Sequence, residues 1–509
     1  MNPPNRLSRS TSVWLAAGLA TFTVRAHATD IIVPPTGSIA AAIRVAGPSD
    51  RVLVMPGTYV EQIDFAGKDI PVIGIQGATK TILDGGGAAP VVRFASGQTA
   101  AARLIGFTVT GGNSSTGPGG ILASGATPTV EDCIVTRNFG RFGGGIGGNP
   151  ILRRCSIHGN VANVSNGGGI YGAPTIESCV IANNRVSRGS GAGVYVSTGN
   201  VSITNSVFVE NFVVLTGRKG GGLYISNTAN VVVQRCLFVR NHIAAGIYAA
   251  TGGGIFTASA STRVESCTFF GNTLVGSSSD GASIWGSAIV RDSILRGGTA
   301  SEASASTVLT YCNVQGGAGG TNIDADPSFV DATNGDFHLD HGSVCVDRGD
   351  PAKKDLDGSR IDMGAFAFAT LYARANTEAV TWGAPAWSEV SSLVGGKQEL
   401  RILMGPAAAG AIYVGTGSAS GTVPGFSFGS LHVPLNPDWY FLATLGTPNA
   451  PWLPGARGTL DANGRGSMAF VLNSGVLAPT APVPLDHAIV AFASVAVLAS
   501  DAARVVIQP

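Results

Sequence analysis

Charge is scarce in this chain. Charged residues make up 12% of 509 residues, and 32 Lys and Arg nearly balance 31 Asp and Glu, so the formal net charge is +1. A strong positive balance, typical of nucleic-acid binders, is missing, and so is the high net charge of disordered proteins. No stretch reaches the ~20 apolar residues that a membrane-spanning helix needs. These absences argue against a nucleic-acid partner and a transmembrane segment.

Common catalytic and metal-binding motifs are also missing. The sequence has no Walker loop, no HExxH and no CxxC, so neither a nucleotide site nor a zinc site is indicated. All seven cysteines lie between Cys133 and Cys345, and an odd number cannot pair completely. Whether Cys312 and Cys345 form a disulfide stays open.

Glycine, in contrast, is abundant, with 72 residues or about twice its usual share of ~7%. Many of these glycines belong to a repeat of 22 to 31 residues. Each unit has a Cys or Ser anchor, an apolar residue two positions later, an Asn five positions after most anchors, and then a glycine-rich step followed by an apolar residue. The anchors are Cys133, Cys155, Cys179, Ser206, Cys236, Cys267 and Ser293, and the asparagines are Asn138, Asn160, Asn184, Asn211, Asn241 and Asn272.

The apolar positions of this repeat alternate with period two, which predicts short strands. One unit cannot bury its inward side alone, so the units must stack into a parallel β-solenoid. We expect the anchor and the residue two positions later to point inward, with the anchor cysteines as buried free thiols. The asparagines should form an internal hydrogen-bonded stack, and Gly and Asn should supply the positive φ of the turns.

The two ends of the chain differ from the repeat. Arg6 and Arg9, the apolar run 13–24 and the small-x-small cleavage pattern Ala26-His27-Ala28 predict a secretory signal peptide over residues 1–28, which places the protein outside the cytoplasm. Residues 38–46 should form a helix with Ser38 as N-cap that covers the first coil. Residues 371–509 alternate apolar strands with Gly and Pro turns, which predicts an antiparallel β-sandwich. Its strands are expected at Leu400–Met404, Ala411–Val414, Trp439–Thr444, Ser467–Leu472 and His487–Leu498.

Several strings carry a family resemblance. RVLVMPGTYVEQIDF, GKDIPVIG and TILDGG, followed by C-x-apolar-x-x-N coils with GGGI steps, resemble the right-handed parallel β-helix family of pectin-lyase-like fold. The string from Asp324 to Phe368 resembles the choice-of-anchor Q terminal segment of secreted bacterial β-helix proteins. LNPDWYFLATLG and RGTLDANGRGSMAFVL resemble a C-terminal β domain of large secreted bacterial proteins. The resemblance implies an all-β protein with a right-handed parallel β-helix over residues 29–323, a terminal segment over 324–370 and the β-sandwich over 371–509.

Charge is unevenly spread along this architecture. Residues 101–300 carry 14 Lys or Arg against 7 Asp or Glu, whereas residues 324–362 carry ten Asp against four basic residues. A long basic face suits an acidic polysaccharide. We therefore expect a monomeric secreted or cell-surface protein that presents a mildly basic face to such a polymer and requires no cofactor. The expected substrate-binding residues are Arg137, Arg141, Arg185, Arg188 and Arg240.

An enzymatic alternative remains open. β-Helix polysaccharide lyases use Arg or Lys as a base beside the substrate carboxylate, so the resemblance implies a pectate- or uronate-type lyase with Arg218, Lys219 and His242 as catalytic residues. The paired-acid motifs of hydrolases with this fold are missing from the repeat. Asp355-x-Asp357 begins a calcium-loop motif without completing it, which makes it a candidate calcium site and, more simply, a turn.

Other charges have a structural interpretation. Glu131, Arg153 and Glu177 stand two residues before successive anchors, and so do Glu265 and Arg291. We expect these opposite charges to pair across neighbouring strands on the surface.

Overall fold

The computed structural model describes residues 29–94, 97–215, 218–244, 249–275, 280–317, 319–355, 359–369, 371–375, 389–391, 396–428, 431–473, 483–492, 497–500 and 503–508. The predicted signal peptide, residues 1–28, and Asp357 of the candidate calcium site lie outside these ranges.

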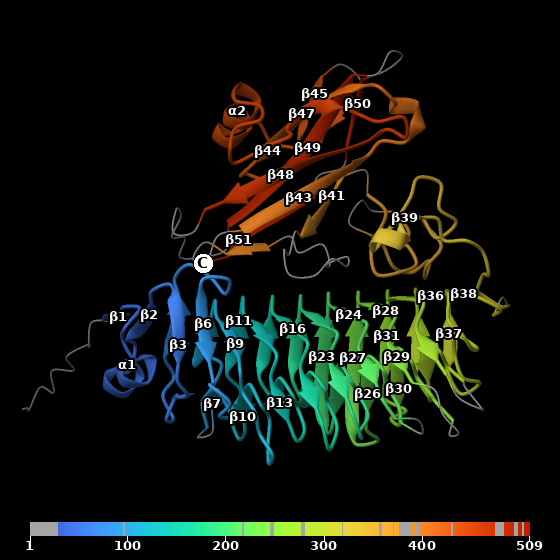
Figure 1. Cartoon of the computed structure of the whole chain (residues 1–509). Coiled ribbons are helices and arrows are strands. Elements are labelled where there is room, and N and C mark those ends of the chain that lie inside the picture. The colour runs from blue at the N-terminus through green and yellow to red at the C-terminus, as the bar shows by residue number, and fades with distance from the viewer. Residues whose placement is uncertain are drawn as a thin grey trace, which may run out of the picture.

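A parallel β-solenoid forms the first part of the described chain (Figure 1). Its strands fall into four sheets, named A to D here, and each strand pairs in parallel with strands of neighbouring coils. Sheet A contains β1 (Asp30–Val33), β2 (Arg51–Val54), β5 (Pro71–Gly74), β8 (Arg103–Ile105), β11 (Thr129–Glu131), β15 (Ile151–Arg153), β19 (Thr175–Glu177), β23 (Gly199–Thr204), β27 (Ala229–Gln234), β31 (Arg263–Glu265), β35 (Ile289–Arg291) and β37 (Val308–Thr310). Sheet B contains β3 (Gly57–Val60), β6 (Thr81–Asp84), β9 (Thr108–Thr110), β12 (Ile134–Thr136), β16 (Ser156–His158), β20 (Val180–Ala182), β24 (Val207–Val209), β28 (Leu237–Val239), β32 (Thr268–Phe270), β36 (Ile294–Arg296) and β38 (Asn313–Val314).

The other two sheets complete each coil. Sheet C contains β4 (Ile63–Asp64), β7 (Val92–Phe94), β10 (Ile121–Ala123), β14 (Ile146–Gly148), β18 (Ile170–Gly172), β22 (Val194–Val196), β26 (Leu223–Ile225), β30 (Ile255–Thr257) and β34 (Ile284–Trp285). Sheet D, between sheets B and C along the chain, contains β13 (Phe139–Gly140), β17 (Val161–Ala162), β21 (Arg185–Val186), β25 (Phe212–Val213), β29 (His242–Ile243) and β33 (Thr273–Leu274). Inward side chains from sheets A, B and C form one continuous apolar core.

The predicted asparagine stack is present at the corner between sheets B and D. All six stacked asparagines are 0% exposed. In the five that follow Asn138, the side-chain oxygen accepts hydrogen bonds from the backbone N–H and the side-chain amide of the asparagine in the preceding coil, at 2.9–3.2 Å. The side-chain oxygen of Asn138 accepts the N–H of Gly112 at 3.0 Å. The positive φ of this corner, however, belongs to the residue before the asparagine, as in Arg137 (54°), Asn183 (52°) and Arg240 (51°). Gly159 (63°) and Gly271 (63°) take the same position, so Gly and Asn supply part of the positive φ as predicted, and charged residues supply the rest.

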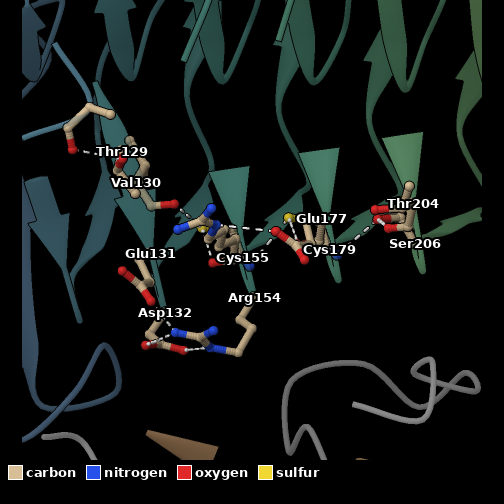
Figure 2. A network of polar contacts seen from close by, with 12 residues as sticks. Thr129, Val130, Glu131, Asp132, Arg154, Cys155, Glu177, Cys179, Thr204 and Ser206 are labelled. Carbon is tan, nitrogen blue, oxygen red and sulfur yellow. Dashed lines mark hydrogen bonds and ion pairs between the residues drawn. The ribbon is translucent and has the colours of Figure 1, made fainter. Parts of the chain in front are cut away.

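The anchors form a second buried stack, between sheets A and B (Figure 2). The N–H of Cys155 donates to Cys179 Sγ at 3.5 Å, and the N–H of Cys179 donates to Ser206 Oγ at 3.0 Å. Each thiol or hydroxyl in turn donates to the carbonyl two residues earlier, as Cys179 does to Glu177 at 3.2 Å. This explains why either Cys or Ser can occupy the anchor position: both side chains are small, and both accept and donate a hydrogen bond. All seven cysteines are buried and free, so Cys312 and Cys345 form no disulfide.

The glycine-rich step is required where a coil turns into sheet C. Gly167 has a φ of 72°, and a Cβ on Gly168 would lie 2.5 Å from the carbonyl oxygen of Ala192 in the next coil. The first position therefore needs a left-handed backbone, and the second lies too close to the neighbouring coil for any side chain.

A short helix closes the first coil, as predicted. Helix α1 (Ile39–Val45) begins after Ser38, whose side chain accepts the N–H of Ala41. Ile39 and Ile43 are buried in the solenoid core. Lys68 Nζ donates to three carbonyls at the end of α1, which neutralises that end of the helix.

The segment after the last coil folds back on the outer side of sheet B. It contains the antiparallel pair β39 (Phe329–Asp331) and β40 (Asp336–Leu339), joined by the 3-10 turn η1 (Ala332–Asn334). Phe337 packs in one apolar cluster with Val180, Val207 and Leu237, which point away from the solenoid interior. These outward side chains are therefore buried, and their surface is not free.

The C-terminal domain is built from small, mostly antiparallel sheets. One contains β41 (Leu371–Ala375), β43 (Gly396–Leu403) and β48 (Arg465–Leu472). The second contains β42 (Glu389–Ser391), β51 (Ala503–Gln508), β49 (Val483–Phe492), β44 (Ile412–Ser418) and β47 (Arg457–Thr459), with β50 (Val497–Ala499) paired to β49. A short turn, η2 (Pro406–Ala408), and the pair β45 (Phe426–Phe428) and β46 (Leu431–Val433) complete it. Both larger sheets contribute to one apolar core.

Two predicted strands of this domain were wrong. His487–Leu498 is not a single strand, because β49 ends at Phe492 and β50 pairs with it in the antiparallel sense. Residues Trp439–Thr444 lie in helix α2 (Trp439–Gly446), not in a strand. Asp438 caps this helix by accepting the N–H of Phe441 at 2.9 Å. The N-cap outweighs the strand preference of the adjacent aromatic residues.

The C-terminal domain lies along one side of the solenoid, and Arg465 of β48 binds Asp340 of the terminal segment at 2.7 Å (Figure 1). Strand β13 of sheet D lies on the side of the solenoid away from the C-terminal domain in this view.

Candidate functional site

All the arginine, lysine and histidine candidates lie on one narrow side of the solenoid. We call it the D face: sheet D together with the turns that join sheet B to sheet D and sheet D to sheet C, from β12 to β34. The B-to-D turn carries Arg137 and Arg240, the strands of sheet D begin with Arg185 and His242, and the D-to-C turn carries Arg141, Arg188, Arg218 and Lys219.

Charge is segregated around the coil. The D face carries seven of the 14 Lys and Arg found in residues 101–300 but only two carboxylates, Glu210 and Asp280. The remaining five carboxylates of this region lie on sheet A or at the corner between sheets A and B; they are Glu131, Asp132, Glu177, Glu265 and Asp292. The D face thus holds an excess of five positive charges (7 − 2), against two (7 − 5) on the other sides of residues 101–300.

On the opposite side, cations and carboxylates pair. Figure 2 shows Arg154 beside Asp132, with Nε and Oδ1 2.9 Å apart. Arg154 and Arg103 both bind the buried carboxylate of Glu131. Burial alone would raise the pKa of Glu131, but the charge of Arg154 and the hydrogen bond and charge of Arg103 outweigh burial and lower it.

The predicted surface pairs are only partly correct. Arg153 does pair with Glu177, at 3.2 Å, and both are about half exposed. Glu131, however, pairs with Arg103 and Arg154 in place of Arg153, and its carboxylate is buried.

The second predicted pair is also wrong. Glu265 and Arg291 are neighbours in sheet register, but Glu265 binds Lys353 at 3.4 Å and Arg291 lies 4.0 Å from Asp350. Lys353 and Asp350 belong to the folded-back terminal segment, whose charges compete for both partners. The acidic terminal segment is thus partly neutralised by the solenoid.

The cations of the D face are exposed and poorly matched by carboxylates. Arg137, Arg141, Arg185, Arg188 and Arg218 are exposed. Neither these five nor Lys219 forms an ion pair with another residue in the described part of the chain. Arg240 lies 4.0 Å from Glu210. The arrangement can therefore accept a polyanion without first breaking strong ion pairs.

A ladder of aromatic rings borders the D face on sheet C. Its members occupy one outward position in successive coils: Tyr171, Tyr195, Tyr224, Phe256 and Trp285. Neighbouring rings stack with centroids 4.5–5.3 Å apart and planes within 4–14°. Lys219 Nζ lies 4.4 Å from the ring centroid of Phe256. Burial raises the pKa of Tyr195 to about 12, with Tyr224 and Tyr171 adding to the shift.

Sequence reasoning missed this ladder. Its signal lies in the repeat itself, as an aromatic residue directly after the apolar residue of five successive glycine-rich steps, from Ile170-Tyr171 to Ile284-Trp285. A shorter stack lies on sheet D, where Arg185 lies 5.9 Å over Phe212 and Phe212 stacks on His242 with centroids 5.0 Å apart.

The three catalytic candidates of the lyase alternative lie on the D face but are not linked. In the described ranges, no hydrogen bond or ion pair joins Arg218, Lys219 and His242. His242 Nδ1 lies 2.6 Å from Thr273 Oγ1, and burial lowers the pKa of His242.

The candidate calcium residues lie in the terminal segment. Asp355 Oδ2 accepts the N–H of Asp362 at 2.9 Å, so this carboxylate holds a turn. Within the described ranges, no three His, Cys, Asp or Glu side chains gather as metal ligands. Because Asp357 lies outside those ranges, the calcium site stays a prediction.

The fold agrees with the one family match found. Residues 94–258, from the end of β7 to just past β30, match the family described as right handed beta helix region. Together with the sheet order, this match defines an all-β protein with a right-handed parallel β-solenoid. No curated protein matches the chain. Neither helix among the described residues is long enough to cross a bilayer.

Proposed function

We propose that this chain is a secreted or cell-surface β-helix protein that binds an acidic polysaccharide along its D face. The extracellular location rests on the N-terminal sequence pattern. The fold is compatible with polysaccharide binding but does not choose a function by itself.

The observation that carries the proposal is the segregation of charge around the coil. Seven cations share the D face with two carboxylates, whereas five carboxylates and seven cations share the other sides. The cations repeat along the solenoid with the coil spacing of about 4.8 Å per strand. A linear polymer with a carboxylate on its sugar units could therefore contact several of them in succession, and their fields add along the face.

Affinity chromatography tests this proposal with a matched control. The protein is loaded at low salt on columns carrying pectate, alginate or a glycosaminoglycan. The test variant changes the D-face residues Arg141, Arg185, Arg188 and Arg218 to Gln. The control variant makes the same change at four exposed arginines on or beside sheet A, namely Arg153, Arg235, Arg263 and Arg291.

We expect the wild type and the control to be retained on at least one acidic glycan and to elute with salt, since exposed charges are screened within ~10 Å at 0.1 M salt. The D-face variant should pass through the column. Passage of the wild type at low salt, or equal losses in the two variants, would refute the proposal, because their net charges are identical.

The lyase alternative is favoured by one observation, the lowered pKa of His242. A neutral imidazole can accept a proton from a sugar carbon beside a carboxylate. Lys219 is less suited as a base, because the ring faces of Phe256 and Trp285 stabilise its ammonium form. Incubation with the same glycans and measurement of the ultraviolet absorbance of unsaturated products distinguishes the two functions. Product that vanishes in His242→Gln would assign lyase activity, whereas binding without product supports the proposal.

A further inference from the structure

The aromatic ladder has one end where a ring face lacks an aromatic neighbour. Phe256 stacks on one side of Trp285, with centroids 4.8 Å apart and planes at 6°. In the following coil Ala303 pairs with Ile284, so Ser304 takes the row position next to Trp285. A serine side chain has no ring, and Trp285 remains partly exposed. Among the described rings of the ladder, the outer face of this indole is thus the one not covered by another stacked ring.

The opposite end of the ladder differs. Phe142 lies against Tyr171 with centroids 5.0 Å apart and planes at 53°. The middle rings are covered by neighbours on both sides; Tyr195 and Tyr224 remain partly exposed, whereas Phe256 is buried. A flat ligand can therefore stack at the Trp285 end, but not in the middle.

A positive charge lies at the same end. Lys219 reaches along the stack from its own coil, and its Nζ lies 4.4 Å from the Phe256 ring centroid and 5.6 Å from that of Trp285. No carboxylate of the described chain pairs with this ammonium group. The ammonium is thus fixed beside the indole and can still accept an anionic partner.

We propose that Trp285 stacks against one pyranose ring of the bound polysaccharide and that Lys219 binds the carboxylate of that sugar. This inference rests on the proposed function and specifies its ligand as a uronate. One side of a pyranose ring presents C–H groups, which suit the electron-rich face of an indole. The carboxylate of the sugar supplies the negative partner that Lys219 lacks within the described chain. From this point the polymer runs along the D-to-C turns, past Arg218 and Arg188.

Calorimetric titration with uronate oligosaccharides tests this site, with the matching neutral oligosaccharide as a second ligand. The variants are Trp285→Ala, Trp285→Phe and Lys219→Met, and Phe142→Ala at the other end of the ladder is the control. Thermal melts by circular dichroism establish that each variant is folded. Trp285→Phe keeps a stacking ring should Trp285→Ala prove unstable.

We expect Trp285→Ala to weaken uronate binding by about three- to tenfold, as the loss of one ring contact implies. Trp285→Phe and Phe142→Ala should bind the uronate with an affinity within about twofold of the wild type. This change is smaller than the loss of one ring contact would cause. Lys219→Met should weaken binding of the uronate but not of the neutral sugar. Uronate binding with unchanged affinity in Trp285→Ala would overturn this inference and leave the proposed function intact, whereas no uronate binding by the wild type would remove both.

Discussion

The asparagine stack allows a quantitative prediction, because two neighbouring asparagines play opposite roles. Asn184 is 0% exposed, and its Oδ1 accepts the N–H of Asn160 at 3.1 Å while its amide donates to the carbonyl of Ile157 at 2.8 Å. Asn184→Ala deprives two backbone groups at a buried corner of these partners, at about 1–3 kcal/mol each. We therefore expect a loss of about 2–6 kcal/mol in the free energy of unfolding. Asn183, one residue earlier, is exposed and has a φ of 52°.

Asn183→Ala forces alanine into the left-handed region and should cost only about 1–2 kcal/mol. Asn183→Gly should be nearly neutral, whereas Asn184→Gly should cost as much as Asn184→Ala or more. Equilibrium urea unfolding followed by far-ultraviolet circular dichroism measures all four variants. Positions 183 and 184 both start as asparagine and receive the same new residue, so effects of the substitution on the unfolded chain largely cancel in the comparison. The reasoning fails if Asn184→Ala lowers the free energy of unfolding by less than about 2 kcal/mol, or by less than Asn183→Ala does.

Two further predictions concern buried titratable groups. Cys179→Ser should be more stable than Cys179→Val by about 1–3 kcal/mol in urea unfolding, because valine cannot accept the N–H of Cys155; equal stability would contradict a hydrogen-bonding role. Burial raises the pKa of Asp362 from 3.8 to about 6, and Asp355 and Asp347 add to it. The folded state then binds more protons than the unfolded chain between about pH 4 and 6, so the free energy of unfolding should fall as pH rises through this window. Thermal melts across that pH range measure how stability changes with pH. Asp347→Asn should make this change smaller, because it removes one of the charges that raise the pKa of Asp362. A stability that rises with pH in this window would refute the prediction.

The repeat made the solenoid predictable before any coordinates. A period of 22–31 residues with inward anchors left stacking as the way to bury the core, and the asparagines and α1 lie where the pattern placed them. The wrong predictions arose where a nearby residue offered a stronger interaction than the one that the pattern indicated. Trp439–Thr444 has strand-forming aromatics, yet the cap at Asp438 starts a helix there. Glu131 has an opposite charge in strand register, yet Arg103 and Arg154 bind it.

The candidate site was less predictable, because it depends on which residues share a side of the coil. The sequence showed that the cations stand after the asparagine corner or before the glycine step. It did not show that most carboxylates would lie on the other side of the coil. In five coils, the residue at the ladder position was visible as an aromatic after the glycine step. Its meaning required the register between coils, which aligns Tyr224, Phe256 and Trp285 into one stack.

The distribution of paired and unpaired cations follows from what covers the solenoid. The terminal segment packs over sheet B and brings Lys353 within 3.0 Å of the buried carboxylate of Asp292 and Asp324 within 2.8 Å of Arg296. Charges beneath such a cover lose water and must be paired, since an unpaired buried charge is costly. The D face carries exposed arginines, whose charges water can solvate at little cost in stability. Unpaired cations can therefore be kept on that side for a ligand, and removing them should weaken binding without weakening the fold.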